Sequence, residues 1–339
     1  MSTLDTVSDR SNSWARLFSR VVKFFRTGFA EGILILILLA FFVIFALTSP
    51  SFLTVNNLWN LVRQVAIIGV VSIGMTIVII SAGIDLSVGS MVGFSNVLVA
   101  LLMTHGIPII PSILITLGAG SALGVLNGVL IYDGRVPPFI ATLGMMTAVR
   151  GLLMLISGAR MIAGLPRPFL NFARIDILWM PSLFFVWLLV IALSVVMTTV
   201  TRFGRNVFAL GSNPEAARLS GINIRATLYG VYAFSALTSS IAGILYTSRL
   251  ANGIPTAGEG YELDAIAAAV VGGASLMGGA SLMGGEGTIL GTVLGALIIA
   301  TLRNGGDLLG INPFILQIAI GVLIVAAVLI DQLSKRQNA

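Results

Sequence analysis

The chain has 339 residues, and its composition indicates a lipid environment. Apolar residues make up 57% of it and 38 glycines add to them, whereas charged residues make up 9% against about 25% in soluble domains. So few charges cannot cover a water-exposed surface, which excludes a soluble enzyme, a nucleic-acid-binding protein and a disordered chain. Cysteine is absent and histidine occurs once, which excludes disulfide scaffolds, cysteine nucleophiles, zinc clusters and iron–sulfur sites.

Ten apolar runs predict an all-α polytopic membrane protein with about ten transmembrane helices. The runs cover residues 32–47, 65–81, 88–104, 108–131, 139–157, 181–200, 227–248, 265–276, 289–302 and 313–330. The eighth run is too short and too rich in glycine for an ordinary span, and it fits a tilted, broken or re-entrant helix. Before the first run, residues 14–26 predict a basic amphipathic helix on the membrane surface, retained rather than cleaved as a signal peptide.

Lys and Arg residues predict the orientation of the chain. With ten spans both termini lie on one side, and that side holds about two thirds of the basic residues, so both termini are expected in the cytoplasm. We divide the chain into a cytoplasmic basic N-terminal segment (1–29), a transmembrane domain (30–331) with a long polar loop (201–226), and a cytoplasmic tail (332–339). Arg150 is the only cation that we place inside a span.

Three polar residues lie among the apolar runs at positions that favour function or packing. Asp85 lies in a short glycine-containing segment between two runs, where it and Ser87 can cap the next helix, the favoured role, or face a solute pathway. Asn96 and Asn127 lie inside spans. Each can bind a hydroxylated solute or, more commonly, a neighbouring helix.

The polar loop predicts a short helix of about two turns. Asn213 is a good N-cap, Pro214 suits the first helical position, and Gly221 ends the pattern. A capped surface helix of this kind can dock into a groove of a partner protein. The alternative is a plain connecting helix.

This helix also carries a sequence resemblance. The segment Glu215-Ala-Ala-x-x-x-Gly221 resembles the E-A-A-x-x-x-G signature of ABC importer permeases, in which it forms the coupling helix that contacts the ATP-binding subunit. Over about residues 52–331 the chain is similar to sugar permeases of the ribose/xylose/arabinose/galactose type. The motifs that carry this similarity are Gly83-Ile-Asp-Leu-Ser-Val-Gly-Ser90, Val136-Pro-Pro-Phe-Ile-Ala-Thr-Leu-Gly-Met-Met146, Gly204-Arg with Gly211-Ser-Asn-Pro-Glu-Ala-Ala-Arg-Leu-Ser-Gly-Ile-Asn223, and Gly258-Glu-Gly-Tyr-Glu-Leu-Asp-Ala-Ile-Ala-Ala268.

The resemblance implies the permease subunit of an ATP-driven ABC importer for a monosaccharide or related polyol, in the bacterial cytoplasmic (inner) membrane. Its expected partners are a separate ATP-binding subunit, a periplasmic or lipid-anchored solute-binding protein, a second permease copy (identical or a sister chain) and membrane lipid. ATP and Mg are expected on the ATP-binding subunit. The chain lacks a phosphate-binding G-x-x-x-x-G-K-[ST] loop and is not expected to be an enzyme, to bind a cofactor or metal, or to bind nucleic acid.

The resemblance and the polar residues give three sets of candidate functional residues. The expected contacts with the ATP-binding subunit are Gly204, Arg205, Asn213, Glu215, Ala216, Ala217 and Gly221. The candidate translocation pathway comprises Asp85, Ser87, Asn96, Asn127, Phe139 and Thr142. One predicted outer loop carries Arg160, Arg167 and Arg174, although basic residues normally favour the cytoplasmic side. These arginines either pair with carboxylates of the solute-binding protein or make local contacts.

One departure and several alternatives stay open. Residues 272–277 are repeated at 278–283, where the family has one copy, and this duplication either lengthens a cytoplasmic turn silently or shifts the register before the ninth span. The alternative functions are an ABC permease for a non-sugar solute, such as a nucleoside, a furanosyl signal or a branched amino acid, and an ion-coupled secondary transporter. The coupling-helix signature and the scarcity of buried carboxylates disfavour the secondary transporter.

Overall fold

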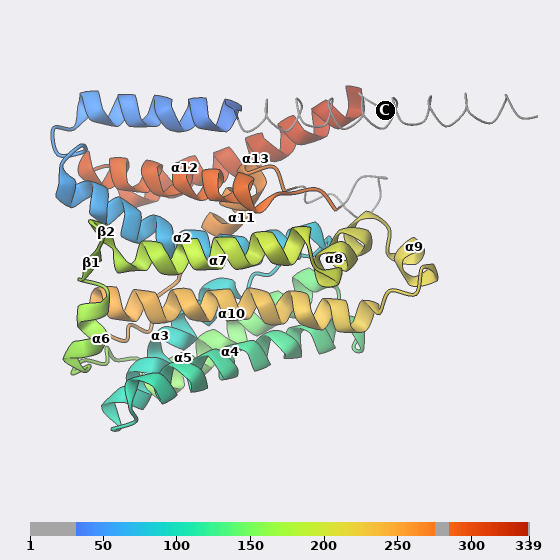
Figure 1. The fold of residues 1–339 in the computed structure, drawn as a ribbon, viewed down its shortest axis with the longest axis horizontal. Coiled ribbons are helices and arrows are strands. Elements are labelled where there is room, and N and C mark those ends of the chain that lie inside the picture. Colours follow the sequence, from blue (N-terminus) through green and yellow to red (C-terminus); the bar gives the residue numbers. More distant parts are fainter. Residues whose placement is uncertain (1–31, 275–284, 338–339) are drawn as a thin grey trace, which may run out of the picture.

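The computed structural model describes residues 32–274 and 285–337. Long helices run side by side, and short elements close the bundle at both ends (Figure 1). One end carries α8 and α9, and the opposite end carries α6 and strands β1 and β2 (Figure 1). We call them the α9 end and the α6 end.

Helices account for most of the described chain. The first described helix covers Gly32–Thr48. The other elements are α2 (Val55–Ile80), α3 (Val88–Thr104), α4 (Ile109–Tyr132), α5 (Pro138–Ser157), α6 (Arg167–Phe172), β1 (Asp176–Ile177), β2 (Met180–Pro181), α7 (Ser182–Thr199), α8 (Arg202–Ser212), α9 (Pro214–Leu219), α10 (Ile224–Leu250), α11 (Tyr261–Val271), α12 (Ile289–Leu308) and α13 (Pro313–Gln337). Strands β1 and β2 pair antiparallel in a two-stranded hairpin.

Capping side chains and prolines mark where the helices begin. The side chain of Thr54 accepts a hydrogen bond from the backbone at the start of α2, and Asn213 and Asn223 do the same for α9 and α10. Pro138 and Pro214 occupy the first positions of α5 and α9, where a missing N–H costs no helical hydrogen bond.

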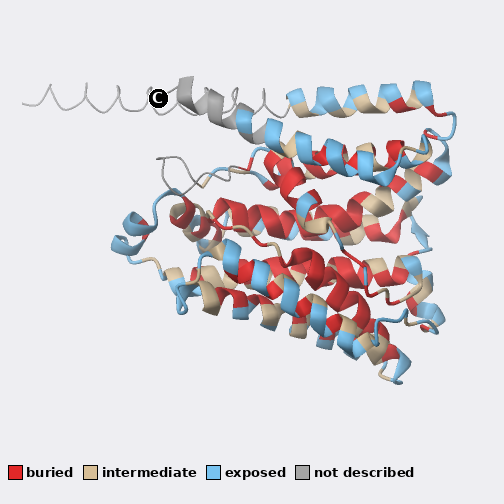
Figure 2. Cartoon of the chain, turned by 180° about the vertical axis from the view of Figure 1, so that it is seen from behind, coloured by how far each residue is buried: buried red, intermediate tan, exposed pale blue. Residues whose placement is uncertain are grey.

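Helix α2 is the centre of the bundle. In its most apolar stretch 89% of the residues are buried, against 22% for α4. It packs against α7, α10, α11 and α12, and its Ile and Val side chains lie in the core that these helices share. Buried residues fill the interior of the bundle, and exposed residues lie on its outer helices and ends (Figure 2). Gly69 and Gly74 leave room for Trp187 of α7 and for Thr238 of α10, since an added Cβ would overlap both. Such close approach stabilises helix packing where lipid offers no hydrophobic gain.

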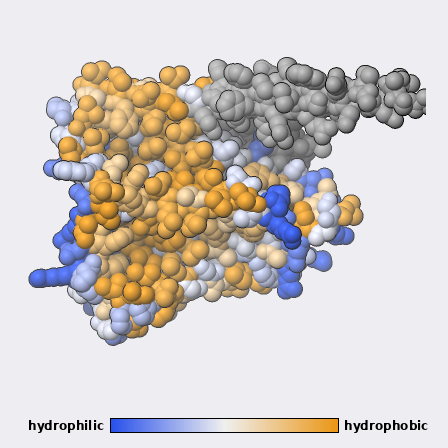
Figure 3. Space-filling view, viewed as in Figure 1, coloured by the Kyte–Doolittle hydropathy of each residue, from blue (hydrophilic) through white to orange (hydrophobic). Residues whose placement is uncertain are grey.

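The polytopic helical fold is confirmed, and each of the ten predicted runs contains a helix. Six of the described helices (α2, α4, α5, α7, α10 and α12) are long and apolar enough to cross a membrane. Apolar side chains cover a broad surface between the two ends of the bundle. Hydrophilic residues gather at the ends themselves (Figure 3). The number of helices that cross and the side of the termini stay predictions.

Several predicted helix boundaries were wrong, and the observed ones change which charged residues lie inside candidate spans. Helix α2 begins at Val55 rather than at residue 65, and α10 and α12 also extend beyond the predicted runs. Arg63, Arg225, Arg249 and Arg303 therefore lie within candidate spans, and the statement that Arg150 is the only cation there was wrong. The cause is that the apolar-run criterion stops at a charge, whereas a helix continues as long as its backbone hydrogen bonds are made.

The eighth predicted run corresponds to the short helix α11. Its 11 residues extend about 16 Å, roughly half of the hydrocarbon thickness. An irregular segment, residues 251–260, precedes it inside the bundle. This arrangement fits the broken or re-entrant alternative. The surface helix predicted at 14–26 and most of the duplicated segment lie outside the described residues.

Candidate functional site

The predicted two-turn helix is present as α9, Pro214–Leu219. The side chain of Asn213 accepts the N–H of Ala216 at 3.0 Å and caps its start. Glu215 and Ala216 are exposed, Ala217 is buried beneath them, and Leu219 at the tip is 85% exposed. Helix α9 therefore presents a small polar and apolar surface at the end of the bundle.

The end of α9 requires glycine. The N–H of Ile222 donates to the carbonyl of Ala217 at 3.1 Å, and the N–H of Gly221 donates to Arg218 at 3.0 Å. This is the Schellman arrangement, which places the residue after the C-cap in the left-handed region. Gly221 has φ of +79°. Its conformation is one that proline cannot adopt and that other residues adopt only with strain.

Helix α8, which sequence reasoning missed, fixes α9 to the bundle. An added Cβ on Gly204 would lie 2.4 Å from the carbonyl of Thr198, and one on Gly211 would lie 1.7 Å from the carbonyl of Ile80. Both glycines thus let α8 pack directly on the ends of α7 and α2. Arg205 is exposed and donates to the carbonyl of Val200 at 3.0 Å. The strong amphipathic alternation of residues 202–212 was the signal that could have revealed this helix.

Helix α10 connects the α9 end to the interior and packs most extensively against α4. Gly120, Gly124 and Gly128 recur every fourth residue on α4, and an added Cβ at each would overlap α10. Near α9, Arg225 pairs with Asp133 at 3.2 Å, and the hydroxyl of Tyr229 donates to the same carboxylate. The two helices are therefore in direct contact over several turns.

Asp85 lies at the centre of a buried polar cluster. Its Oδ1 accepts hydrogen bonds from the backbone N–H (2.9 Å) and the hydroxyl (2.5 Å) of Ser87, and its Oδ2 accepts from the hydroxyl of Ser235 on α10 (2.8 Å). Asn127 of α4 donates to the hydroxyl of Ser87 at 3.0 Å. No side-chain hydrogen bond caps α3 from Ser87, so that part of the capping prediction was wrong. The Asp85 carboxylate accepts the N–H of Ser87 immediately before α3, closes the turn there and joins it to α10.

Two buried polar atoms beside this cluster have no hydrogen-bond partner among the described residues, Oδ1 of Asn127 and the hydroxyl of Tyr232. The Tyr232 hydroxyl lies against Gly83, where an added Cβ would be 2.5 Å from it. Thr142 donates to the carbonyl of Ile84 at 3.1 Å. Uncompensated polar atoms in a buried site favour water or a polar ligand.

The remaining pathway candidates lie elsewhere. Phe139 is 49% exposed on α5, so its side chain is not part of the buried cluster. Asn96 donates to the hydroxyl of Thr247 at 2.7 Å and accepts the N–H of Ile254 at 2.5 Å, so it binds α10 and the irregular segment 251–260. Arg150 donates to two carbonyls of that segment at 3.0 Å. These two side chains satisfy backbone groups that lipid could not.

The predicted docking arginines lie at the α6 end. Arg160, Arg167 and Arg174 are all exposed, and none has an ion-pair partner within residues 32–274 and 285–337. The segment that carries them is anchored by reciprocal backbone hydrogen bonds between Ile162 and Gly253 and by the ion pair of Arg63 with Asp176 at 3.2 Å. Docking and local contacts both stay predictions for these arginines.

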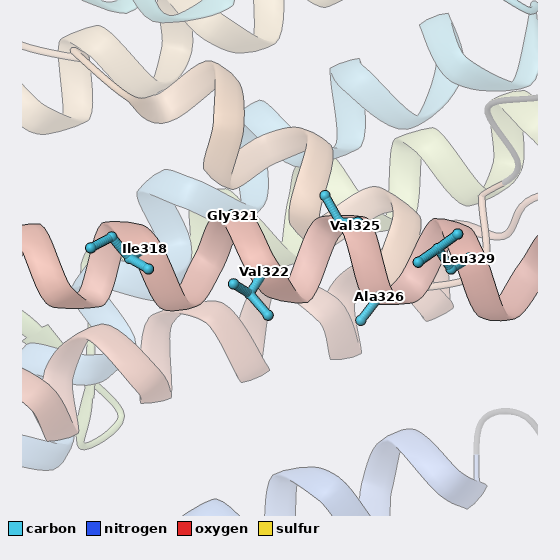
Figure 4. Close-up of a pocket in the computed structure, with 6 residues that line it drawn as sticks. All are labelled: Ile318, Gly321, Val322, Val325, Ala326 and Leu329. Carbon is cyan, nitrogen blue, oxygen red and sulfur yellow. The ribbon is translucent and has the colours of Figure 1, made fainter.

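A groove on α13 is unsuited to a polar solute. It is lined by Ile318, Gly321, Val322, Val325, Ala326 and Leu329, whose side chains project from one stretch of the helix (Figure 4). None of these side chains can form a hydrogen bond. No group of three or more potential metal ligands occurs in the described part of the chain.

Sequence reasoning missed the residues of α10 that complete the Asp85 cluster. Ser235 and Tyr232 belong to none of the motifs. The available signal was the density of hydroxyl residues in an otherwise apolar helix, because such residues are retained in a span mainly for hydrogen bonding.

Comparison with known proteins identifies the family. Residues 57–329 match the family described as branched-chain amino acid transport system / permease component. The chain is similar to the ribose import permease protein of Bacillus subtilis (42% identical over 77% of this chain and 80% of the relative). It is also similar to the D-allose transport system permease protein of Escherichia coli (36% identical, 86% and 88%) and the galactose/methyl galactoside import permease protein of Salmonella typhimurium (35% identical, 83% and 87%).

No solved structure matches this chain. The family match covers most of the chain, and the alignments cover 80% and 88% of two of the relatives. The similarity thus covers α9, the Asp85 cluster and the bundle that joins them. The chain belongs to the family of ABC importer permeases, and it is a membrane permease subunit rather than the enzyme that hydrolyses ATP.

Proposed function

We propose that this chain forms the transmembrane pathway of an importer for a monosaccharide or a related polyol in the bacterial inner membrane. The observation that carries the proposal is α9: a capped helix with an exposed surface at one end of the bundle, joined through α10 to the buried Asp85 cluster. The named substrates of the similar permeases, ribose, D-allose and galactose, support a sugar.

In this proposal the α9 end faces the cytoplasm and α9 is the coupling helix. Glu215, Ala216 and Leu219 contact a separate ATP-binding subunit, which holds ATP and Mg. Nucleotide binding draws α9 with it, and α10 and α4 transmit the movement to the segment that holds Asp85. Alternating access follows if this segment opens toward one side at a time.

The α6 end then faces outward and receives a solute-binding protein. The exposed arginines Arg160, Arg167 and Arg174 supply positive charge for acidic residues on its rim. A second permease copy, identical or a sister chain, completes the core. The family description leaves a branched-chain amino acid as the second candidate substrate, but the hydroxyl and amide groups of the Asp85 cluster suit a neutral polyhydroxylated solute better than a zwitterion.

The test is ATPase activity in lipid nanodiscs after co-expression with candidate ATP-binding subunits. Solute-binding proteins loaded with pentoses, hexoses or inositols are added to wild type and to the double variant Glu215→Ala/Gly221→Pro. We expect one loaded receptor to stimulate the wild type and not the variant, because proline cannot adopt the φ of +79° at Gly221.

The matched control is Gly310→Pro, which changes another glycine of positive φ, +66°, away from α9. It is expected to retain stimulation. Import that persists on a proton or sodium gradient without any ATP-binding subunit would show that a secondary transporter is the correct function.

A further inference from the structure

Six polar side chains lie together toward the α6 end of the bundle, far from the Asp85 cluster. They are Arg63 of α2, Tyr246 and Arg249 of α10, Tyr261 and Asp264 of α11, and Arg303 of α12. We call them the tyrosine–arginine cluster. Tyr246 and Arg249, and likewise Tyr261 and Asp264, are three residues apart and share a helix face.

Contacts between the helices bring these groups to one place. The rings of Tyr246 and Tyr261 meet edge to face with centroids 6.0 Å apart. Nη2 of Arg303 lies 2.7 Å from Oδ1 of Asp264. Arg249 lies one turn beyond Tyr246 on the same face of α10, and Arg63 lies on α2, which packs against α10, α11 and α12. Four helices that pack on one another thus carry the cluster.

The cluster has unused hydrogen-bonding capacity. Within the described residues, the buried Nε atoms of Arg63 and Arg303 and the buried Oδ2 of Asp264 have no partner. Arg249 forms no ion pair there either. Leaving such groups unpaired in a buried site is unfavourable, so a site that retains several of them is suited to a polar occupant.

The cluster is accessible as well as polar. The side chain of Arg63 is 18% exposed and that of Arg303 is 30% exposed, while Asp264 between the helices is fully buried. Tyr246, Arg249 and Tyr261 are half-buried. Parts of the Arg63 and Arg303 side chains are therefore reached from outside the protein core, and Asp264 lies behind them.

The chemistry of the cluster selects a neutral polyhydroxylated solute. Guanidinium N–H groups donate to hydroxyl oxygens, the free oxygen of Asp264 accepts from a hydroxyl, and tyrosine rings pack against the C–H face of a sugar ring. An anion suits the site less well, because two of its three arginines, Arg63 and Arg303, are already paired with carboxylates and the free oxygen of Asp264 would repel it.

We propose that the tyrosine–arginine cluster is a solute-binding site, distinct from the Asp85 cluster, that takes a sugar or polyol at the α6 end. The substrate class rests on the proposed function. The site holds the solute by hydrogen bonds at the first stage of its passage, before it reaches Asp85.

A thiol-labelling experiment tests occupancy directly, because the chain contains no cysteine. Tyr246→Cys gives the chain a single thiol in the cluster, and Met161→Cys, 60% exposed at the α6 end, is the matched control. In the assembled transporter in nanodiscs, labelling by N-ethylmaleimide is followed by the mass of this chain. D-ribose, D-allose, D-galactose, inorganic phosphate and sulfate are compared as protecting solutes.

We expect a sugar to slow labelling of Tyr246→Cys about threefold, because a solute at about twice its dissociation constant leaves about a third of the sites free. Labelling of Met161→Cys should not change. Protection by phosphate or sulfate instead of sugar would overturn the proposal, and so would the absence of protection by every solute in a transporter that still imports.

A second variant distinguishes failure of this site from failure of the proposed function. Tyr261→Leu is expected to lower import per ATP hydrolysed about tenfold, equivalent to about 1.4 kcal/mol, while receptor-stimulated ATPase activity persists. Tyr261→Phe retains the ring and should lose less, and Tyr132→Leu, on an exposed tyrosine at the end of α4, should match wild type. Unchanged import in Tyr261→Leu would contradict the proposal. If no loaded receptor stimulates even the wild type, the proposed function itself fails.

Discussion

At the scale of single residues, Asp85 is a buried carboxylate that links the loop after α2 to α10. Its two oxygens accept three hydrogen bonds, from the backbone and hydroxyl of Ser87 and from Ser235, and it is 1% exposed. A buried carboxylate without a cation beside it is stabilised by such donors alone. The loop between α2 and α3 is therefore held in place by α10, the helix that follows α9.

Replacing this carboxylate tests that dependence. Asp85→Ala should lower the free energy of unfolding by about 1–3 kcal/mol, because the hydroxyls of Ser87 and Ser235 lose their buried acceptor. Thermal unfolding of the detergent-solubilised protein measures the change. Thr147→Ala, which removes an exposed helix hydroxyl, should stay within about 0.5 kcal/mol of wild type. Equal melting temperatures for the two variants would contradict this account.

At the scale of elements, α4 and α10 pack directly on each other. In the proposed importer this contact transmits movement of α9 to the segment that holds Asp85. An added Cβ on Gly124 would lie 2.4 Å from the carbonyl of Tyr232 and 2.6 Å from Cβ of Ala236. The backbones of the two helices therefore touch at this level, and only glycine fits. Gly118, on the same helix, has nothing within 4 Å of such a Cβ.

This pair gives a matched comparison within one helix. Gly124→Ala should destabilise the protein by about 1–3 kcal/mol through overpacking, whereas Gly118→Ala should be neutral or stabilising by about 0.5–1 kcal/mol. The fraction that remains monodisperse in gel filtration after heating measures both. Similar survival of the two variants would show that α4 and α10 are not in direct contact.

At the scale of the whole molecule, the two ends carry different chemistry. The α9 end presents a capped helix with an exposed leucine, and the α6 end presents exposed arginines. In the proposed importer each end meets a different soluble partner, and the apolar surface between them lies in the membrane (Figure 3). Long-range charge attraction affects association with a soluble receptor mainly at low salt.

Reversing the outer charges tests the assignment of the α6 end. The triple variant Arg160→Glu/Arg167→Glu/Arg174→Glu should raise the receptor concentration for half-maximal ATPase stimulation about tenfold at low ionic strength, and the difference should shrink as salt is added. Arg135→Glu, beside the Asp133 end of α4, is the control for a charge reversal elsewhere. Receptor-stimulated ATPase activity that is intact in the triple variant would count against docking at these arginines.

The sequence by itself determined the features that depend on composition and on neighbours along the chain. The lipid environment followed from the scarcity of charge, and α9 followed from Asn213, Pro214 and Gly221, because caps act within one turn. The helix α8 and the lengths of α2, α10 and α12 did not follow, since a charge interrupts an apolar run without ending a helix.

Only the tertiary structure decided which polar groups meet. Asp85 and Ser235 are 150 residues apart in sequence, and their hydrogen bond depends on the packing of α10 beside the loop that follows α2. The same holds for the tyrosine–arginine cluster, whose members come from four helices. Hydrogen bonds and ring contacts act over a few ångströms, so they are decided by which helix faces pack together, and no local pattern in the sequence records that choice.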